Sequence, residues 1–496
     1  MSEDRRTPDT APDMTDAEFR RALDKVGAWV ASFRAGVGEL PVLARVRPGE
    51  VTDALPALPP ENGDGVEAWL ADLDRVVVPA LTHWNHPGFM AYFGITGSAP
   101  GILGELVSSA LNVNGMLWKT SPALTELEQV VLRWYARATG LPADWFGMLT
   151  DTASTSTLVA LAAAREAAGL GIRERGMAGL PALVLYCSEE AHSSVEKAGI
   201  VLGIGRDNVR RIPSDERFRM RVDALEEAIA SDLAAGRRPF AVTATVGTTS
   251  ATAVDPVGAT ADVCQRHGLW LHVDAAYAGS AAVAPEFRWA LDGCERADSL
   301  VANPHKWLFT PIDCSALYTR RPEVFRRALS LVPEYLRTDA GDVVDLMDYS
   351  FQLGRRFRAI KLWFVFRHFG TEGIAARIRE HVRLAHVFAE LVDAEPSMER
   401  LAEVPFSVVC FRVHPPAIDR EDELEALNTA ILERVNASGE VFLSHTKLKG
   451  RYCLRLAVGN LQTTEGHVRR AFELVSASAP PRVHYNGGRP PVGRRG

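Results

Sequence analysis

Two polar residues follow apolar, strand-like segments and suit imine chemistry. The segment LWLHVDAAYAG, residues 269–279, is an apolar run that reaches Asp274, and NPHKW, residues 303–307, follows the next such run and contains Lys306. A buried carboxylate needs a cationic partner, and a protonated pyridine-type nitrogen is one. Apolar surroundings lower a lysine pKa and free the amine for imine formation. Taken alone, Asp274 could equally be a turn residue, and a lone lysine is usually a solvated surface group.

A histidine and the start of a helix supply two more candidate groups. His192 follows the strand-like ALVLYC, where an imidazole can lie flat on a planar ring, although a buried structural histidine is the commoner case. In DTASTSTLVALAAAR, residues 151–165, Thr152, Ala153 and Ser154 offer backbone N–H groups and hydroxyls at a helix N-terminus, which suits a phosphate. Simple N-capping is the alternative. The chain has no G-x-x-x-x-G-K-[ST] run, which argues against a nucleotide triphosphatase.

These groups need a scaffold that brings them together, and the hydrophobic pattern predicts one. From about residue 117, helical segments such as 125–139 and 155–168 alternate with short β-rich runs at 182–187, 240–247, 269–276, 299–303 and 315–319. Apolar strands separated by helices predict an α/β fold with a mostly parallel, seven-stranded-type sheet flanked by helices. Ligands of such sheets bind beyond the carboxyl ends of the strands, which is where the candidate residues fall.

The remaining segments predict a division into domains. Residues 15–111 read as an N-terminal helical segment, 112–394 as the large α/β domain and 395–479 as a small α+β domain. The polar ends, 1–14 and 480–496, are expected to be disordered tails, the second of them basic.

Composition narrows the function classes. The formal net charge is −7, so nucleic acid is not an expected partner. The six cysteines are scattered without a C-x-x-C pair, which favours buried free thiols over a metal site or disulfides. The N-terminus lacks an apolar secretory segment, and no apolar run reaches membrane-spanning length. A cytoplasmic protein that acts on a small molecule, without membrane contact, is the expectation.

Taken together in this order, the segments resemble the fold-type-I pyridoxal-phosphate enzymes, and within them the group II decarboxylases of the aromatic-L-amino-acid decarboxylase branch. The resemblance runs from about residue 83 to about residue 476, and NPHKW and LGRRFRAIKLW are its most specific parts. It is carried by HPGFMAYF, SPALTELE, DTASTSTLVAL, AHSSVEKAG, VGTTS, WLHVDAAYAGSA, ADSLVANPHKWL, DCSAL and LGRRFRAIKLWFVFR.

The resemblance implies a role for each matching residue. Lys306 would carry pyridoxal 5'-phosphate as a Schiff base, Asp274 would pair with the pyridine nitrogen, and His192 would stack on the ring. The other cofactor contacts it implies are Ala276 on the ring, Thr249 beside it, and Thr152, Ala153, Ser154, Asn303 and His305 around the phosphate. Tyr335, in PEYLR, would donate a proton to Cα after carbon dioxide leaves.

For the substrate, the resemblance implies an aromatic L-amino acid bound at a homodimer interface. Gly354 would leave room for a ring, with apolar walls from Phe93, Met116 and Trp118. No arginine cluster suited to a side-chain carboxylate is visible. The sequence does not rank tryptophan, phenylalanine, tyrosine and dihydroxyphenylalanine.

Two departures and three alternatives stay open. Asp151 stands where relatives often have a small residue, and an acid near a phosphate is unfavourable unless it points away or caps another donor. The segment FGITG, residues 93–97, also differs from the expected pattern of animal members. There are three alternative functions. One is an aldehyde synthase, which would have Phe in place of Tyr335, and another is a transaminase, which would need a carboxylate-binding arginine in the small domain. The third is a catalytically silent binding protein.

Overall fold

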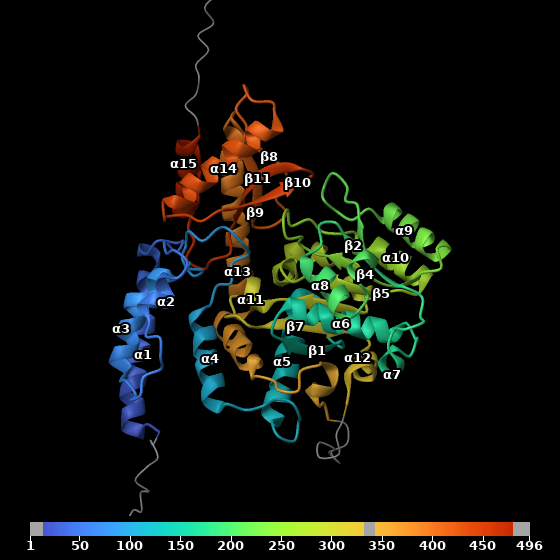
Figure 1. Cartoon of the computed structure of the whole chain (residues 1–496), viewed down its shortest axis with the longest axis horizontal. Helices are drawn as coiled ribbons and strands as arrows, with labels where there is room; N and C mark the ends of the chain where they lie inside the picture. Colours follow the sequence, from blue (N-terminus) through green and yellow to red (C-terminus); the bar gives the residue numbers. More distant parts are fainter. Residues whose placement is uncertain (1–12, 332–342, 480–496) are drawn as a thin grey trace, which may run out of the picture.

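A seven-stranded sheet forms the centre of the molecule (Figure 1). The structure is a computed structural model that describes residues 13–331 and 343–479. The strand order is β1-β7-β6-β5-β4-β2-β3, and β7 alone runs antiparallel to its neighbours β6 and β1. The strands are β1 Phe146–Thr150, β2 Leu183–Ser188, β3 Val209–Ile212, β4 Arg238–Thr245, β5 Trp270–Asp274, β6 Ser299–Ala302 and β7 Ser315–Thr319. This arrangement confirms the predicted mostly parallel sheet.

Helices flank the sheet and bury its apolar strands (Figure 1). The Ala-rich α6 runs across the sheet and contacts β1, β4, β5, β6 and β7, because its small side chains allow close approach. The helices of this domain are α5 Pro122–Thr139, α6 Ala153–Ala167, α7 Ile172–Arg175, α8 Ser193–Val201, α9 Val222–Ala234, α10 Val257–His267, α11 Pro304–Trp307 and α12 Pro322–Leu329.

A smaller four-stranded antiparallel sheet, in the order β10-β11-β9-β8, forms the C-terminal part with α14 and α15. The long α13, Arg358–Ala394, links the two sheets and is interrupted at Gly370, whose φ is 62°. Beyond this break, α13 contributes Leu384 and Phe388 to the second hydrophobic core, so the packing of the small domain begins inside α13, before the predicted boundary at 394/395. The other elements are β8 Met398–Arg400, β9 Val408–Val413, α14 Glu421–Ala437, β10 Ser444–Leu448, β11 Arg451–Ala457 and α15 Glu465–Ser478.

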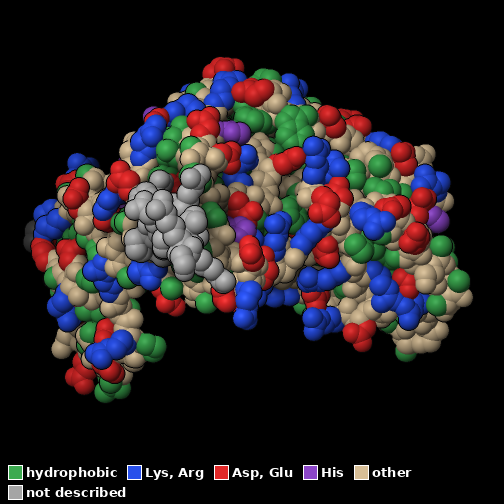
Figure 2. Space-filling model, turned by 90° about the horizontal axis from the view of Figure 1, so that it is seen from above, with side chains coloured by type: hydrophobic (Ala, Val, Ile, Leu, Met, Phe, Trp, Pro, Cys, Tyr) green, Lys and Arg blue, Asp and Glu red, His purple; other side chains and the backbone are tan. Residues whose placement is uncertain are grey.

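The N-terminal segment is helical, with α1 Asp16–Gly36, α2 Glu50–Ala54, α3 Val66–Asp72 and α4 Ala99–Leu111. Helices α1 to α3 stand at one side of the molecule, and α4 packs on α13 (Figure 1). In the space-filling view an arm of the molecule projects away from the main body (Figure 2). Helix α1 buries none of its residues within the chain.

Several sequence predictions can be compared with this fold. All six cysteines are free and buried, as expected. Within the described residues, no helix is both long and apolar enough to cross a membrane. Tyr335, the tail 480–496 and all but the last two residues of the tail 1–14 lie outside the described residues.

Candidate active site

The predicted cofactor residues line one cavity of about 190 Å³ beyond the carboxyl ends of β2, β4, β5 and β6. Eleven of its fourteen lining residues are among those predicted from the sequence. Larger cavities of about 470 and 380 Å³ lie elsewhere and include none of the predicted residues, so chemistry and not volume identifies the site. The lining residues are Phe93, Thr152, Ala153, Ser154, His192, Thr245, Gly247, Thr249, Asp274, Ala276, Tyr277, Asn303, His305 and Lys306.

Lys306 projects from the short helix α11, which begins directly after β6. Its side chain keeps some exposed surface toward the cavity, but its amine is enclosed by protein and lies 5.4 Å from the centre of the Phe93 ring. Burial lowers the pKa of Lys306, and the nearby Asp274 offsets part of that effect. A larger fraction of the amine is therefore neutral and nucleophilic near pH 7 than for a surface lysine.

Asp274 and His192 approach the same cavity from two different strands. Asp274 is the last residue of β5, is buried, and accepts a hydrogen bond of 3.0 Å from the Ala276 amide. His192 caps α8, where its Nδ1 accepts a hydrogen bond from the Ser194 amide, which places the ring proton on Nε2. His192 is exposed at the open cavity, yet partial desolvation lowers its pKa and keeps it neutral near pH 7.

The start of α6 and the β6–α11 junction form the other end of the cavity. Thr152 caps α6 through its hydroxyl, which accepts from the Thr155 amide, and the first amides of the helix have no intrahelical acceptor. Asp151 lies directly before this helix start, and its charge acts on His305. Its carboxylate accepts a 2.6 Å hydrogen bond from the Thr152 amide, so this departure from the family pattern acts as a local cap.

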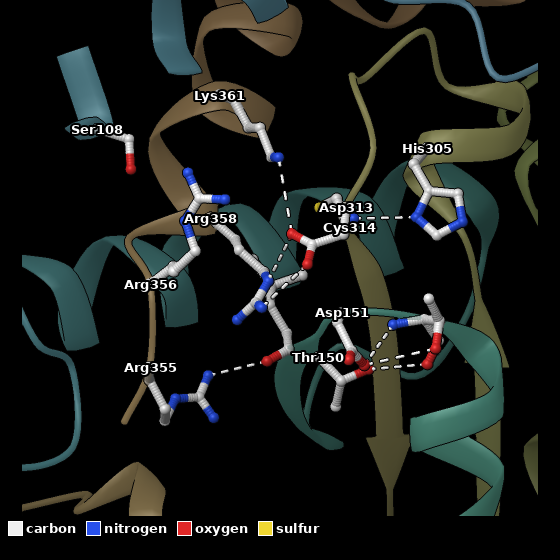
Figure 3. Close-up of polar contacts among 12 residues, drawn as sticks. Ser108, Thr150, Asp151, His305, Asp313, Cys314, Arg355, Arg356, Arg358 and Lys361 are labelled. Atoms are coloured by element: carbon white, nitrogen blue, oxygen red, sulfur yellow. Dashed lines mark hydrogen bonds and ion pairs between the residues drawn. The ribbon is translucent and has the colours of Figure 1, made fainter. Parts of the chain in front are cut away.

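His305 and Asn303 direct polar atoms into the same end. The Cys314 amide donates to His305 Nδ1 at 2.9 Å, so Nε2 carries the proton (Figure 3). Burial, with the charge of Lys306 next, lowers the pKa of His305 to about 4, so the ring is neutral. Asn303 Oδ1 is buried and has no hydrogen-bond partner among the described residues. His305 Nε2 lies 3.3 Å from Asn303 Nδ2, and these donors, with the first amides of α6, fit a phosphate group bound here.

Three predicted substrate residues lie apart from this cavity. Met116, Trp118 and Gly354 belong to two segments that pack on each other: the Met347 amide donates to the Met116 carbonyl, and the Trp118 amide donates to Asp345. The Cβ that would be added at Gly354 would meet Asn114. None of the three lines the cavity of its own chain.

Sequence reasoning missed Arg455. This β11 residue is buried, and its guanidinium lies 4.7 Å from the centre of the Phe93 ring, which also stacks with Tyr277 at 3.7 Å. Its Nη1 donates to the Ala91 carbonyl, whereas Nη2 is buried without a hydrogen-bond partner among the described residues. An arginine in a strand such as YCLRLAV carries no distinguishing sequence signal, because its place beside Phe93, which lines the cavity, depends on domain packing.

Comparison with known proteins assigns the family. The chain matches the pyridoxal-dependent decarboxylase conserved domain over residues 48–414, and it belongs to this family of pyridoxal-phosphate enzymes. It is 41% identical over 476 residues to tyrosine decarboxylase 4 of Petroselinum crispum, covering 93% of both chains. It is 40% identical to the phenylacetaldehyde synthase of Arabidopsis thaliana, covering 92% of this chain and 94% of the relative.

A solved structure extends this similarity to the whole fold. The crystal structure of Oryza sativa TDC with PLP and tryptamine matches with a TM-score of 0.92 at 40% identity, covering 95% of this chain and 99% of that one. The fold is therefore that of the fold-type-I pyridoxal-phosphate decarboxylases, and the cofactor is pyridoxal 5'-phosphate. The amides at the start of α6, the side chains of His305 and Asn303, and the amine of Lys306 fit this group.

Proposed function

We propose that this chain decarboxylates an aromatic L-amino acid to the corresponding arylalkylamine and carbon dioxide. One observation carries the proposal. Lys306, whose pKa is lowered by burial, shares one cavity with the buried Asp274 and the aromatic Phe93. Bound pyridoxal phosphate supplies the electron sink that allows the bond from Cα to the carboxylate to break. The similarity to tyrosine decarboxylase 4 supports an aromatic substrate.

In this proposal the residues of the cavity bind and orient the cofactor. Lys306 would attach the cofactor through its Nζ, Asp274 would hold the proton on the ring nitrogen, and His192 would cover one ring face. His192 is exposed at the cavity, as expected of a side chain that the cofactor ring would cover when bound. Ala276 would pack on the other face and Thr249 would lie beside the ring, and the residues that would hold the phosphate are Thr152, Ala153, Ser154, Asn303 and His305.

We further propose that the active unit is a homodimer that acts in the cytoplasm. Met116, Trp118 and Gly354 lie away from the cavity of their own chain, so they would line the substrate pocket of the partner chain. Helix α1, which has no fully buried residue within its own chain, supplies an apolar face for that contact. The six buried free thiols support a reducing compartment.

A substrate panel tests the function. The purified protein, supplied with pyridoxal phosphate, is incubated with tryptophan, phenylalanine, tyrosine, dihydroxyphenylalanine, histidine and glutamate, and the amine products are identified by mass. We expect an aromatic amino acid to have the highest kcat/KM. Glutamate or histidine as the best substrate would contradict the proposal.

Aldehyde formation is the second candidate, because the phenylacetaldehyde synthase of Arabidopsis thaliana is as similar as the decarboxylases. We propose that Tyr335 decides the outcome by delivering a proton to Cα, which releases the amine before dissolved oxygen reacts. Tyr335→Phe should therefore lose most amine production and gain aldehyde, ammonia and hydrogen peroxide. A variant that keeps the full amine yield without peroxide would show that Tyr335 is not the proton donor.

A further inference from the structure

A buried ionic cluster lies directly behind His305, built from Asp313, Arg358 and Lys361 (Figure 3). Arg358 makes two hydrogen bonds to the Asp313 carboxylate, of 2.9 Å from Nε to Oδ1 and 3.1 Å from Nη2 to Oδ2. Lys361 Nζ lies 3.9 Å from Asp313 Oδ1 and 2.6 Å from Glu105 Oε2. Both cations come from the first turn of α13, in the segment RFRAIK.

The cluster is enclosed enough for its charges to matter. The exposed fraction of the side chain is 9% for Arg358, 1% for Lys361 and 25% for Asp313. Burial raises the pKa of Asp313, but the hydrogen bonds and charge of Arg358 and the charge of Lys361 outweigh burial and hold its pKa below the usual value. Asp313 is therefore an anion whose position is fixed by two cations on a long helix.

Asp313 is followed at once by Cys314, whose amide donates to His305 Nδ1 at 2.9 Å. That bond decides the tautomer of His305. With Nδ1 as the acceptor, Nε2–H is a donor that lies 3.3 Å from the Asn303 side-chain nitrogen, so two donors meet at this end of the cavity and a phosphate oxygen can accept from them. If Nδ1 carried the proton, the buried Cys314 amide would lose its acceptor and Nε2 would face the phosphate with a lone pair.

We infer that Asp313, held by Arg358 and Lys361, is a positioning group that fixes the Cys314 amide and thereby keeps His305 as a hydrogen-bond donor to the cofactor phosphate. The inference rests on the assignment of His305 to the phosphate in the proposed function. It gives the RFRAIK segment a defined role, because α13 then anchors the phosphate end of the cavity without contacting the cofactor.

A purely structural ion pair is the competing explanation, since breaking any buried ion pair destabilises a protein. The two explanations differ in their dependence on the phosphate. Loss of a positioned His305 weakens binding of pyridoxal 5'-phosphate and leaves binding of pyridoxal, which has no phosphate, nearly unchanged. General loosening of the site weakens binding of both compounds alike.

The experiment measures the ratio of the Kd for pyridoxal to the Kd for pyridoxal 5'-phosphate. It uses the full-length protein after the cofactor has been removed with a carbonyl-trapping hydrazine. Equilibrium dialysis gives Kd for pyridoxal 5'-phosphate and for pyridoxal in the wild type, Asp313→Asn and Arg358→Lys. We expect the preference for the phosphorylated compound to fall roughly tenfold in Asp313→Asn, as for one lost hydrogen bond to a charged group, and less in Arg358→Lys, which keeps the charge. If Asp313→Asn does not fold, Arg358→Lys provides the test of the cluster in its place.

Arg412→Met is the matched control. Arg412 has a side chain that is 4% exposed and pairs with Glu399 and Glu421 in the small domain, and it does not line the cavity. Its loss should lower the melting temperature without changing the preference for phosphate. An unchanged preference in both cluster variants, or an equal fall in Arg412→Met, would overturn the inference.

A double-mutant cycle separates this inference from the proposed function. His305→Gln alone should lower the preference for phosphate, and adding Asp313→Asn should lower it no further, because both changes remove the same contact. If His305→Gln leaves the preference unchanged, the phosphate assignment itself is wrong. If it lowers the preference and Asp313→Asn adds an independent loss, the assignment stands and the positioning role of Asp313 is rejected.

Discussion

Single residues in the cavity differ sharply from the same residue types at the surface. Burial lowers the pKa of Lys306, and burial also lowers the pKa of His305 to about 4, whereas Asp274 lies close enough to Lys306 to favour the charged amine. The cavity therefore holds a carboxyl group, an amine whose pKa is lowered, and imidazoles whose pKa values are lowered. Such a set of groups suits a cofactor that carries both a phosphate and a ring nitrogen that must stay protonated.

Lys306→Ala should abolish turnover, because no other lysine lines the cavity. Borohydride reduction followed by denaturation should leave the cofactor attached to the wild type and not to the variant. Lys197→Ala, a change at an exposed lysine, is the control and should behave like the wild type. A Lys306→Ala protein that still releases carbon dioxide at the wild-type rate would refute the assignment.

His381 gives a prediction about pH and stability. This buried residue accepts from Trp307 Nε1 at Nδ1 and donates from Nε2 to the Asn460 carbonyl, and burial lowers its pKa to about 4. An unfolded histidine has a pKa of about 6.5, so the unfolded chain takes up the proton first as the pH falls. The stability that neutral His381 contributes is therefore present above about pH 6.5 and is lost as the pH falls toward 4, by up to ~3 kcal/mol.

His381→Gln should flatten this loss of stability between pH 7 and pH 5, although His272 and His305, whose pKa values are also lowered to about 4 by burial, keep part of it. Urea unfolding of the cofactor-free protein at several pH values measures the slope. The exposed His267→Gln should leave the slope as in the wild type. An identical slope in His381→Gln and the wild type would show that His381 does not titrate in this way.

Helices α4 and α13 come into close backbone contact at Gly104 of α4. A Cβ added at Gly104 would lie 2.6 Å from the Lys361 Cα, so the two helix backbones nearly touch there. Gly104→Ala should force the helices apart and destabilise the protein by about 1–3 kcal/mol. Gly258→Ala, in α10, where a Cβ meets nothing within 4 Å, should be neutral or stabilising by up to about 1 kcal/mol.

Melting temperatures of the two alanine variants, measured with and without cofactor, check this prediction. Gly104→Ala should melt below the wild type, and Gly258→Ala should not. Equal melting temperatures for Gly104→Ala and the wild type would mean that α4 can move away from α13 without cost.

The sequence predicted those parts of the site that depend on local pattern. An apolar run that ends in Asp274, and a lysine just after the next strand, follow from strand periodicity and from the rule that ligands bind at carboxyl ends of strands. The antiparallel β7 and the approach of Arg455 were not predictable in this way. Each depends on how segments far apart in the chain pair or pack, which periodicity does not encode.

Two further features show the same limit. The Cys314 amide reaches His305 from the next strand connection, and the 114–118 segment packs on residues 345–355 more than two hundred positions later. The sequence placed Met116, Trp118 and Gly354 at a substrate pocket by resemblance alone, and the structure places them together but away from the cavity of their own chain. The proposed homodimer would reconcile the two, because these residues could then line the cavity of the partner chain.

For the whole molecule, the unpaired apolar face of α1 predicts association. Phe19, Leu23 and Val26 are exposed, with Phe19 57% exposed, and their spacing of four and three residues places them on one face of the helix. We expect a homodimer by light scattering. Leu23→Asp should weaken it, whereas Asp24→Ala, at a neighbouring polar position, should not. A fully active monomer would refute the dimer proposal.

Mixed dimers test whether the partner chain completes each cavity. One chain carries Lys306→Ala and the other Gly354→Phe, which fills the proposed side-chain pocket; each homodimer alone should be inactive. If Gly354 serves the partner's cavity, a mixed dimer has one site with both an intact lysine and an intact glycine, so co-expression should restore roughly a quarter of the wild-type activity, since about half of the dimers are mixed and one of their two sites works. If Gly354 serves the cavity of its own chain, both sites of every mixed dimer are defective, and the co-expressed pair should stay inactive. The location of Gly354 outside its own cavity favours restoration.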